Sequence, residues 1–283
     1  MFNAASKKFR IPALAVLAAA ALASCGPGAE ERAAAELLGQ AEALYDLKDY
    51  SGAIDSINSL DARYRGFTDL RRAGLRLRAL ATEALVKDSI EAVEPELARA
   101  TIACDSLKAL FEYTVPAAEG LDGYYLPKGL KAANAVSATG IQPRVDTEGY
   151  FYLTANINGR VTGLTTVSIT SGSDTWTSTP ISPARVLTVE GSEIASLSPE
   201  ECAGLGTWLA AHEAKGLKGS FNGAKGKVDF SISPALRDMT LLCVEYSEAQ
   251  LARRAAAVQR EKLERKLQAV RDRLANMPLP SQD

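Results

Sequence analysis

The residues of this chain that could perform catalysis are few, and their spacing matches no common active site. His212 is the only histidine of the 283 residues, so a serine–histidine triad would have to use it, yet no Gly-x-Ser-x-Gly sequence is present. Glu200 and Glu201 could form an acid–base pair, but their place just after Ser198 is better explained by the capping of a helix. The glycines between 216 and 226 lack the spacing of a phosphate-binding loop. We therefore predict a non-enzymatic protein, with an unrecognised hydrolase as the weaker alternative.

Four tyrosines are the best candidates for contacts to a ligand. Tyr124 and Tyr125 are adjacent, and Tyr150 and Tyr152 fall on one face of a predicted strand. Aromatic rings stack on sugars or grip a peptide, and phenol hydroxyls supply hydrogen bonds. The alternative is that these rings only pack against neighbouring strands. The four positions therefore define a candidate glycan or peptide site.

The cysteines do not indicate a metal site or a cofactor. No cysteine or histidine spacing resembles that of a zinc site, so we predict neither metal nor cofactor. Cys104, Cys202 and Cys243 fall at apolar positions of segments that we interpret as helices. We expect buried free thiols, and a Cys202–Cys243 disulfide is the alternative.

The composition bounds the class of protein. The formal net charge is −2, whereas nucleic-acid binding needs a strong basic excess, so we predict no nucleic-acid partner. The chain is long enough for one large or two modest hydrophobic cores.

The first 25 residues have the layout of a secretory signal. Lys7, Lys8 and Arg10 precede an apolar run over 11–23, and small residues follow. A helix of that run would reach only about 20 Å, less than the roughly 30 Å of a bilayer core. Leu22-Ala23-Ser24-Cys25 also resembles the lipobox of bacterial lipoproteins.

That resemblance implies where the protein resides. In the lipoprotein family, cleavage would remove residues 1–24, the Cys25 thiol would carry a diacylglycerol, and the new amine would receive a fatty acid such as palmitate. Residue 26 is glycine rather than aspartate, so the signal that retains such proteins on the inner membrane is absent. We expect a cell-envelope protein, lipid-anchored to the outer membrane by Cys25 at its periplasmic face or at the cell surface. Residues 25–28 would be the tether.

Residues 29–112 read as a helical domain. Apolar residues recur at helical spacing over 29–47 and 53–60, with a turn between them. The segment 34–65 resembles one tetratricopeptide repeat at Leu37, Ala41, Leu44, Asp49, Tyr50, Ala53, Ile54, Ile57 and Leu60. Further helices are predicted over 69–86 and over 88–112, the latter with a kink at Pro95. Because such repeats bury their apolar faces by stacking, we predict a degenerate four-helix solenoid or bundle.

Residues 113–232 read as a β-rich domain. Strands are predicted over 150–157, 165–170, 175–179, 184–189, 217–221 and 227–232. Asn158-Gly159 and Asn222-Gly223 predict hairpin turns, because both turn positions need positive φ. Ser198, Pro199 and Glu201 predict a capped helix over 198–215. This region should form an antiparallel β-sandwich or open barrel with one packed helix.

The rest of the chain reads as one long helix over 233–277, followed by a disordered tail over 278–283. Leu263, Leu267, Val270, Leu274 and Met277 form a short coiled-coil seam. The fold class is therefore α+β. We predict a non-enzymatic envelope lipoprotein acting as an adaptor or binding scaffold with another envelope protein as partner. The alternative is a glycan- or peptide-binding module centred on the β-rich domain.

Overall fold

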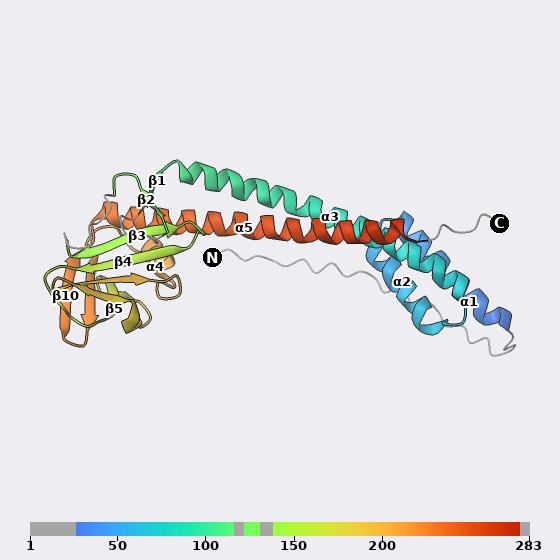
Figure 1. The fold of residues 1–283 in the computed structure, drawn as a ribbon, viewed down its shortest axis with the longest axis horizontal. Coiled ribbons are helices and arrows are strands. Elements are labelled where there is room, and N and C mark those ends of the chain that lie inside the picture. The colour runs from blue at the N-terminus through green and yellow to red at the C-terminus, as the bar shows by residue number, and fades with distance from the viewer. Residues whose placement is uncertain (1–26, 116–121, 131–137, 278–283) are drawn as a thin grey trace. The chain divides into compact units, whose positions relative to one another are not determined.

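The computed structural model describes residues 27–115, 122–130 and 138–277. The predicted signal peptide, the lipid attachment at Cys25 and the tail over 278–283 lie outside these residues. The predicted α+β class is confirmed (Figure 1). In chain order, the described residues form three helices first, then ten antiparallel strands with one short α-helix among them, and a long helix last. The α-helices of the described residues are α1 (Pro27–Asp46), α2 (Tyr50–Arg63), α3 (Thr68–Lys108), α4 (Leu205–Ala211) and α5 (Pro234–Ala275).

The chain divides into two compact units whose boundary falls inside the two longest helices. Unit 1 comprises the residues up to 85 and those from 270 onward, and unit 2 comprises residues 86–269. Helices α3 and α5 therefore each contribute to both units. The predicted domain boundary at residue 112 differs from this division. It marks the change from helix to strand, whereas the two units are divided by which residues contact one another.

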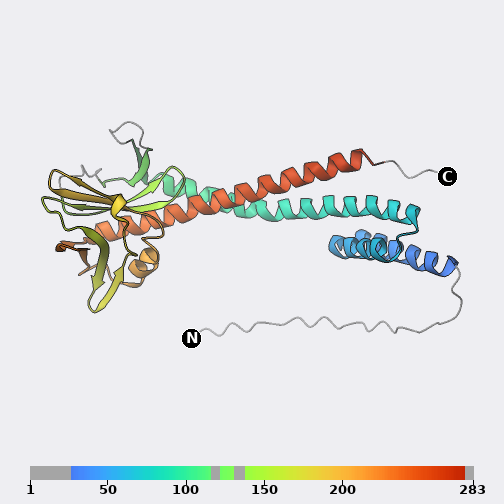
Figure 2. The same cartoon turned by 60° about the horizontal axis from the view of Figure 1, so that its bottom comes forward.

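Unit 1 contains the predicted helical hairpin. Helix α2 begins after Asp49, whose side chain accepts a hydrogen bond from the backbone N–H of Gly52 at 3.0 Å. Figure 2 shows α1 and α2 side by side. Ala41 and Ala53 are fully buried, so small side chains let the two helices approach closely. The ion pair between Arg271 and Glu83, 3.2 Å long, joins the end of α5 to α3 within this unit.

The predicted break between two helices near residue 87 is wrong. Helix α3 is 41 residues long and contains Pro95 in its interior. Pro95 is exposed, so water can satisfy the carbonyl that a proline leaves without a donor in the preceding turn. The half-buried residues Val93 and Leu97 flank it.

Unit 2 contains two antiparallel sheets. Their strands are β1 (Phe111–Thr114), β2 (Tyr124–Pro127), β3 (Gly140–Asp146), β4 (Phe151–Ile157), β5 (Leu164–Ser171), β6 (Asp174–Thr177), β7 (Val186–Val189), β8 (Ser192–Leu197), β9 (Lys218–Gly223) and β10 (Gly226–Ser231). A 3-10 turn over Pro183–Arg185 precedes β7. The larger sheet has the order β1-β2-β3-β4-β8-β7, and the smaller has the order β10-β9-β5-β6.

The hairpin predicted at Asn158-Gly159 is wrong. Strand β4 pairs with β3 and β8, whereas β5 belongs to the other sheet. The chain crosses between sheets here, with φ of +65° at both Gly159 and Gly163. The buried Glu193 holds the crossing by accepting hydrogen bonds from Thr162 and Gly163.

The second predicted hairpin is confirmed, but its turn is two residues further on. Strands β9 and β10 pair antiparallel, with Gly223 opposite Gly226, so Ala224 and Lys225 form the turn. Gly223 is needed for a different reason than expected. A Cβ there would collide with the backbone carbonyl of Thr162, so the glycine permits close approach of the crossing segment.

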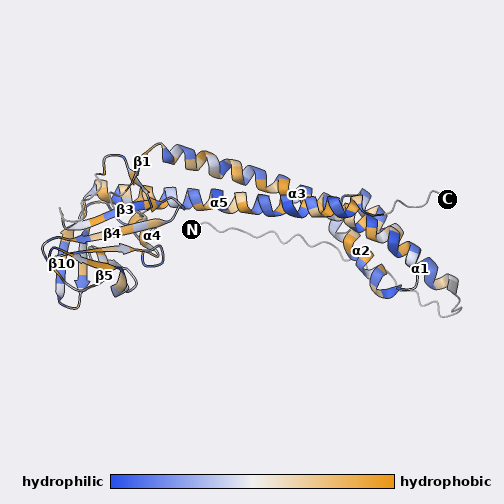
Figure 3. Ribbon diagram, viewed as in Figure 1, coloured by the Kyte–Doolittle hydropathy of each residue, from blue (hydrophilic) through white to orange (hydrophobic). Residues whose placement is uncertain are grey.

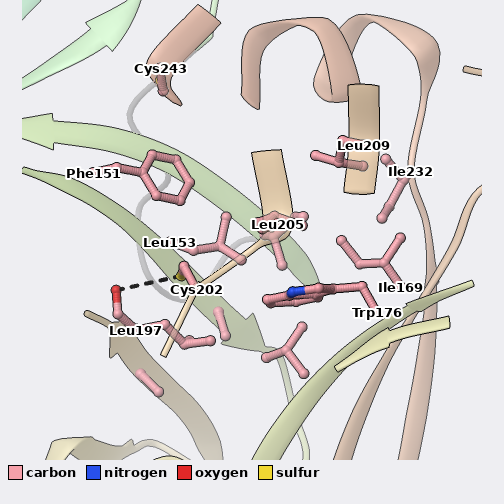
Figure 4. Close-up of a cluster of buried hydrophobic side chains, with 14 of the residues drawn as sticks. Phe151, Leu153, Ile169, Trp176, Leu197, Cys202, Leu205, Leu209, Ile232 and Cys243 are labelled. Carbon is pink, nitrogen blue, oxygen red and sulfur yellow. Dashed lines mark hydrogen bonds between the residues drawn. The ribbon is translucent and has the colours of Figure 1, made fainter. Parts of the chain in front are cut away.

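The core of unit 2 lies where the inner faces of both sheets meet α4, α5 and the end of α3. Figure 4 shows Phe151 and Leu153 of β4 facing Leu205 of α4, with Trp176 of the smaller sheet beside them. Trp176 donates its indole N–H to the carbonyl of Ala203 at 3.0 Å. The core side chains thus fix which face of the larger sheet points inward, and therefore which residues lie on its other face.

The thiols of Cys104, Cys202 and Cys243 are free and buried. The alternative of a Cys202–Cys243 disulfide is therefore wrong. Burial raises the pKa of the Cys202 thiol to about 12, with Glu201 adding to the increase. These cysteines behave as small apolar core residues.

Helix α4 is shorter than the predicted helix over 198–215. The expected capping contacts form, because Ser198 N–H donates to Glu201 at 2.6 Å and Glu201 N–H faces the Ser198 hydroxyl at 3.4 Å. They close a turn rather than open the helix, since Gly204 has a φ of +73°. The helix itself covers Leu205–Ala211.

Helix α5 begins where predicted, with the Ser233 hydroxyl accepting from the backbone N–H of Leu236 at 3.1 Å. Figure 3 shows hydrophilic and hydrophobic residues alternating along it. In unit 2, Arg253 and Arg260 pair with Asp105 and Glu94 of α3 at 3.8 and 2.7 Å. The predicted seam residues further along α5 are half-buried.

Candidate functional site

The sheet register separates the four candidate tyrosines. On β2, β3 and β4, odd-numbered residues such as Val145 and Leu153 belong to the core. Even-numbered residues lie on the opposite side, which we call the outer face. Tyr124 lies opposite Asp146, and Tyr152 lies opposite Arg144. Tyr124 and Tyr152 are therefore brought together on the outer face around Arg144.

Tyr125 and Tyr150 do not join this group. Tyr125 lies on the inner side, with its ring 5.7 Å from that of Tyr246 and 5.3 Å from that of Tyr113. Tyr150 precedes β4, and its backbone N–H donates to Asp146 in the β3–β4 turn at 2.8 Å. Tyr125 therefore packs against other aromatic rings, as the alternative interpretation of the tyrosines predicted. The structure thus reduces the candidate site from four tyrosines to two.

Arg144 is the central polar side chain of the outer face. Its guanidinium lies 5.0 Å from the centre of the Tyr124 ring, a favourable cation–π arrangement, and it donates to the Ser196 hydroxyl of β8. Burial lowers the pKa of Arg144 from its ordinary value, while Tyr124 and Tyr152 act in the opposite direction. Arginine nevertheless stays charged at neutral pH.

The charge of Arg144 has no acidic partner in an ion pair within the part of the chain that the structure describes. One Asp146 oxygen accepts from the backbone N–H groups of Glu148 and Tyr150 at 2.9 and 2.8 Å. Asp122 and Asp146 line the same cavity as Arg144, and the charge of Asp146 acts to raise the pKa of the guanidinium. Arg144 is therefore the cationic group of a cavity that also holds two carboxylates.

A shallow groove runs across the outer face at this point. One cavity of about 220 Å³ is lined by Asp122, Gly123, Tyr124, Arg144, Asp146, Tyr152 and Ser196. A second, of about 360 Å³, shares Tyr152 and Ser196 with the first and continues to Ala184, Arg185, Leu187 and Ile194. We call the two together the outer groove. Its first end carries one guanidinium, two carboxylates and hydroxyl groups. Its second end combines aliphatic side chains with Arg185.

The outer face also carries buried polar groups beside the groove. Thr154 lies opposite Ser196, and Asn156 lies opposite Ile194. Their exposed fractions are 7% and 4%, and among the described residues neither the Thr154 hydroxyl nor the Asn156 side-chain carbonyl has a hydrogen-bond partner. Buried polar groups are normally hydrogen-bonded, so this face differs from an ordinary packed surface.

The phenol of Tyr152 is a hydrogen-bond donor at neutral pH. Burial raises its pKa above the ordinary value, and the nearby Asp146 adds to the increase, while Arg185 opposes it. The Ser196 hydroxyl accepts from Arg144 and keeps its own proton to donate. The groove thus presents one guanidinium, two hydroxyl donors and the carboxylates of Asp122 and Asp146 to a ligand.

His212 has a structural environment away from the groove. Its ring stacks on Trp208 at 4.1 Å, its Nδ1 faces the carbonyl of Trp208 at 2.7 Å, and its Nε2 faces Asp174 at 2.9 Å. These contacts tie the end of α4 to the β5–β6 turn.

Sequence reasoning missed Arg144 and Ser196, because β3 and β8 were not predicted. Pro143 is an unfavourable residue within a strand, since proline lacks the N–H of a sheet ladder. At Pro143 the pairing with β2 has already ended, so only β4 flanks β3 there. The alternation of apolar Ile141 and Val145 with polar Gln142 and Arg144 was the available signal.

Comparisons with known proteins leave the site to be argued from its own geometry. No family model matches the chain, and neither a curated protein nor a solved structure is significantly similar to it. Within residues 27–115, 122–130 and 138–277, no helix is long and apolar enough to cross a membrane. The same residues contain no group of three or more His, Cys, Asp or Glu side chains that could hold a metal ion.

Proposed function

We propose that this protein is a non-enzymatic, lipid-anchored binding protein of the bacterial cell envelope, with the outer groove of unit 2 as its binding surface. The membrane would hold the protein through lipid on Cys25, and the groove would engage a peptide segment of another envelope protein. The single observation that carries the binding role is the outer groove itself, in which half-buried Arg144 lies between Tyr124 and Tyr152.

The character of the groove supports binding rather than catalysis. The hydroxyl of Ser196 lies against a guanidinium, which cannot act as a general base at neutral pH. His212, the only histidine of the chain, is held against Trp208 and Asp174. At the second end of the groove, Leu187 and Ile194 offer aliphatic contact to the side chains of a peptide and few partners for sugar hydroxyls.

The anchor is tested by fractionation. Cys25→Ser should abolish lipid attachment and move the protein from the membrane fraction to the soluble fraction, since one residue would carry all acyl chains. Intact-mass measurement of the parent should show two or three acyl groups. A Cys25→Ser variant that is processed and fractionates like the parent would contradict the lipoprotein proposal.

The binding role is tested by photo-crosslinking from the groove in intact cells. A photoreactive phenylalanine analogue replaces Leu187, which is 61% exposed at the aliphatic end of the groove. The matched control places the analogue at exposed Lys225 in the β9–β10 turn. Adducts should form at 187 and not at 225, as judged by intact mass. Equal labelling at both positions, or none at 187, would count against the groove.

A further inference from the structure

We propose that a second copy of this chain pairs with strand β7 and so joins the larger sheets of two copies edge to edge. The pairing is antiparallel and twofold symmetric, with Thr188 of one copy opposite Thr188 of the second copy. This inference does not rest on the proposed binding function, because it needs no ligand in the outer groove. It follows from one strand edge that is open, uncharged and complementary to itself.

Of the four edge strands that the structure describes, β7 alone has no charged side chain. Strand β1 carries Glu112, β6 carries Asp174, and β10 carries Lys227 and Asp229. Charged side chains on an edge strand oppose pairing with another chain. Strand β7 has the sequence Val-Leu-Thr-Val, and no other described strand than β8 pairs with it. Its free edge is therefore the one that is open to a further strand.

The turn between β7 and β8 determines which backbone groups point out from this edge. Glu190 and Gly191 have φ of +50° and +78° and form a two-residue turn that sets Val189 opposite Ser192. The residues that flank such a turn bond each other through both backbone groups, and the next residue directs its groups away from the partner strand. Thr188 therefore directs its backbone N–H and C=O to the free edge.

Thr188 also fixes the register of the pairing. The other N–H of β7 that points outward, that of Val186, already donates to the carbonyl of Pro183. Within β7, only Thr188 thus has both backbone groups available at the free edge. When it faces Thr188 of the second copy, each residue donates one hydrogen bond and accepts one. A twofold axis through this pair gives an isologous contact, in which the same surface serves both copies.

The side chains of β7 complement themselves in this register. Leu187 lies opposite Val189 of the second copy, and both belong to the outer face, where they are 61% and 41% exposed. The contact repeats on the other side of the axis, so four exposed aliphatic side chains become cross-strand pairs. Arg185, which contacts Glu201 at 3.2 Å in its own copy, precedes β7, and Glu190 follows it. Antiparallel pairing keeps these like charges apart, whereas parallel pairing would bring them together.

The pairing brings the two outer grooves to the same side of one continuous sheet. The twofold axis of two antiparallel strands runs perpendicular to the sheet, so the outer faces of both copies point the same way. Leu187 lines the second end of the groove, so the two grooves meet at the axis.

Disulfide trapping tests the pairing in the purified chain from residue 25, carrying Cys25→Ser, with air as the oxidant. Hydrogen-bonded residues of antiparallel strands have Cα atoms about 5.5 Å apart, a separation that a disulfide spans, so Thr188→Cys should give a linked dimer. The three native thiols are buried. Thr175→Cys is the matched control, because Thr175 is exposed and has the same position beside a two-residue turn on edge strand β6. The dimer should form at least about tenfold faster at 188 than at 175, because pairing raises the effective thiol concentration.

A second substitution separates pairing from chance collision. Val189→Lys, added to Thr188→Cys, puts an ammonium group opposite Leu187 of the second copy and should slow linking by about tenfold or more. A nearby cation lowers the pKa of a thiol and favours its oxidation, so slower linking would report lost pairing and not lost reactivity.

Equal rates at 188 and 175 would overturn the inference, as would a rate at 188 that Val189→Lys leaves unchanged. A Thr188→Cys variant that stays monomeric when purified, but is linked to a different polypeptide in membranes, would assign the edge to another protein and also overturn the pairing. The photo-crosslinking experiment at position 187 stays distinguishable from this one. An adduct with twice the mass of the chain belongs to the dimer, and an adduct of any other mass belongs to a partner of the groove.

Discussion

Replacement of Glu193 by alanine should release the segment that carries the chain from one sheet to the other. Glu193 is 1% exposed. Its carboxylate accepts hydrogen bonds from the Thr162 N–H at 2.7 Å, the Thr162 hydroxyl at 2.7 Å and the Gly163 N–H at 2.8 Å. No water-exposed alternative is available to these donors while the crossing stays closed, because Thr162 is itself fully buried.

The size of the effect follows from these contacts. A hydrogen bond to a charged group contributes about 1.5–3 kcal/mol, and a buried donor left without a partner costs about 1–3 kcal/mol. Water entering the space left by the side chain would recover part of the loss, so we expect Glu193→Ala to lower the free energy of unfolding by about 3–4 kcal/mol. Glu193→Gln keeps one oxygen for Thr162 but turns an NH₂ group toward Gly163 N–H, and should cost about 1–3 kcal/mol.

Urea unfolding followed by tryptophan fluorescence measures this loss. The chain has two tryptophans, Trp176 and Trp208, and both lie in unit 2. Glu213→Ala, at an exposed carboxylate, is the matched control and should change the free energy of unfolding by less than about 0.5 kcal/mol. A Glu193→Ala variant as stable as this control would refute the role of the carboxylate.

The same carboxylate should make unit 2 sensitive to acid. Burial raises the pKa of Glu193, but the hydrogen bonds from Thr162 and Gly163 outweigh burial and hold the pKa below its ordinary value of 4.5. The folded state therefore binds its proton at lower pH than the unfolded chain does. The contribution is fully present above the ordinary pKa and is lost as the pH falls through the folded pKa. The stability gap between parent and Glu193→Gln should shrink over that window, and a gap that stays constant to pH 2 would contradict the charge argument.

Three further predictions concern packing and the thiols. Ala53→Leu should overpack the α1–α2 crossing and cost about 1–3 kcal/mol in thermal unfolding, whereas Ala35→Leu at an exposed site of α1 should be nearly neutral; equal effects would remove the close crossing. Ala256→Leu, at a residue 6% exposed in α5, should cost a similar amount relative to the exposed Ala255→Leu, and equal urea midpoints would contradict the packing. Because burial raises the pKa of Cys202 to about 12, a thiol reagent at pH 8 should label it only after unfolding, and rapid labelling of the native protein would show that the site opens.

Much of the helical architecture could be predicted from the sequence, because its signals are local. The turn before α2 and the start of α5 depend on caps a few residues away, Asp49 and Ser233. The hairpin of β9 and β10 likewise joins neighbouring segments of the chain. The break predicted near residue 87 is absent, because helix α3 continues without interruption from Thr68 to Lys108.

The candidate site could be predicted only in part. Tyr124 and Tyr152 were identified by residue type, but Tyr125 and Tyr150 were grouped with them because sequence distance does not reveal which face a side chain occupies. Arg144 reached the site through the register that places it opposite Tyr152.

The sequence by itself determined the residue types and the local helices and turns of this protein, since these depend on propensities and hydrogen bonds within a few residues. Only the tertiary structure decided where the chain changes sheet and which side chains meet. At Asn158-Gly159 a strong local turn signal was overruled, because Glu193, 31 residues beyond Thr162, supplies the hydrogen bonds of the crossing. The outer groove has the same origin: Tyr124, Arg144, Tyr152 and Ser196 come from four strands, and non-local pairing sets a register that local sequence does not encode.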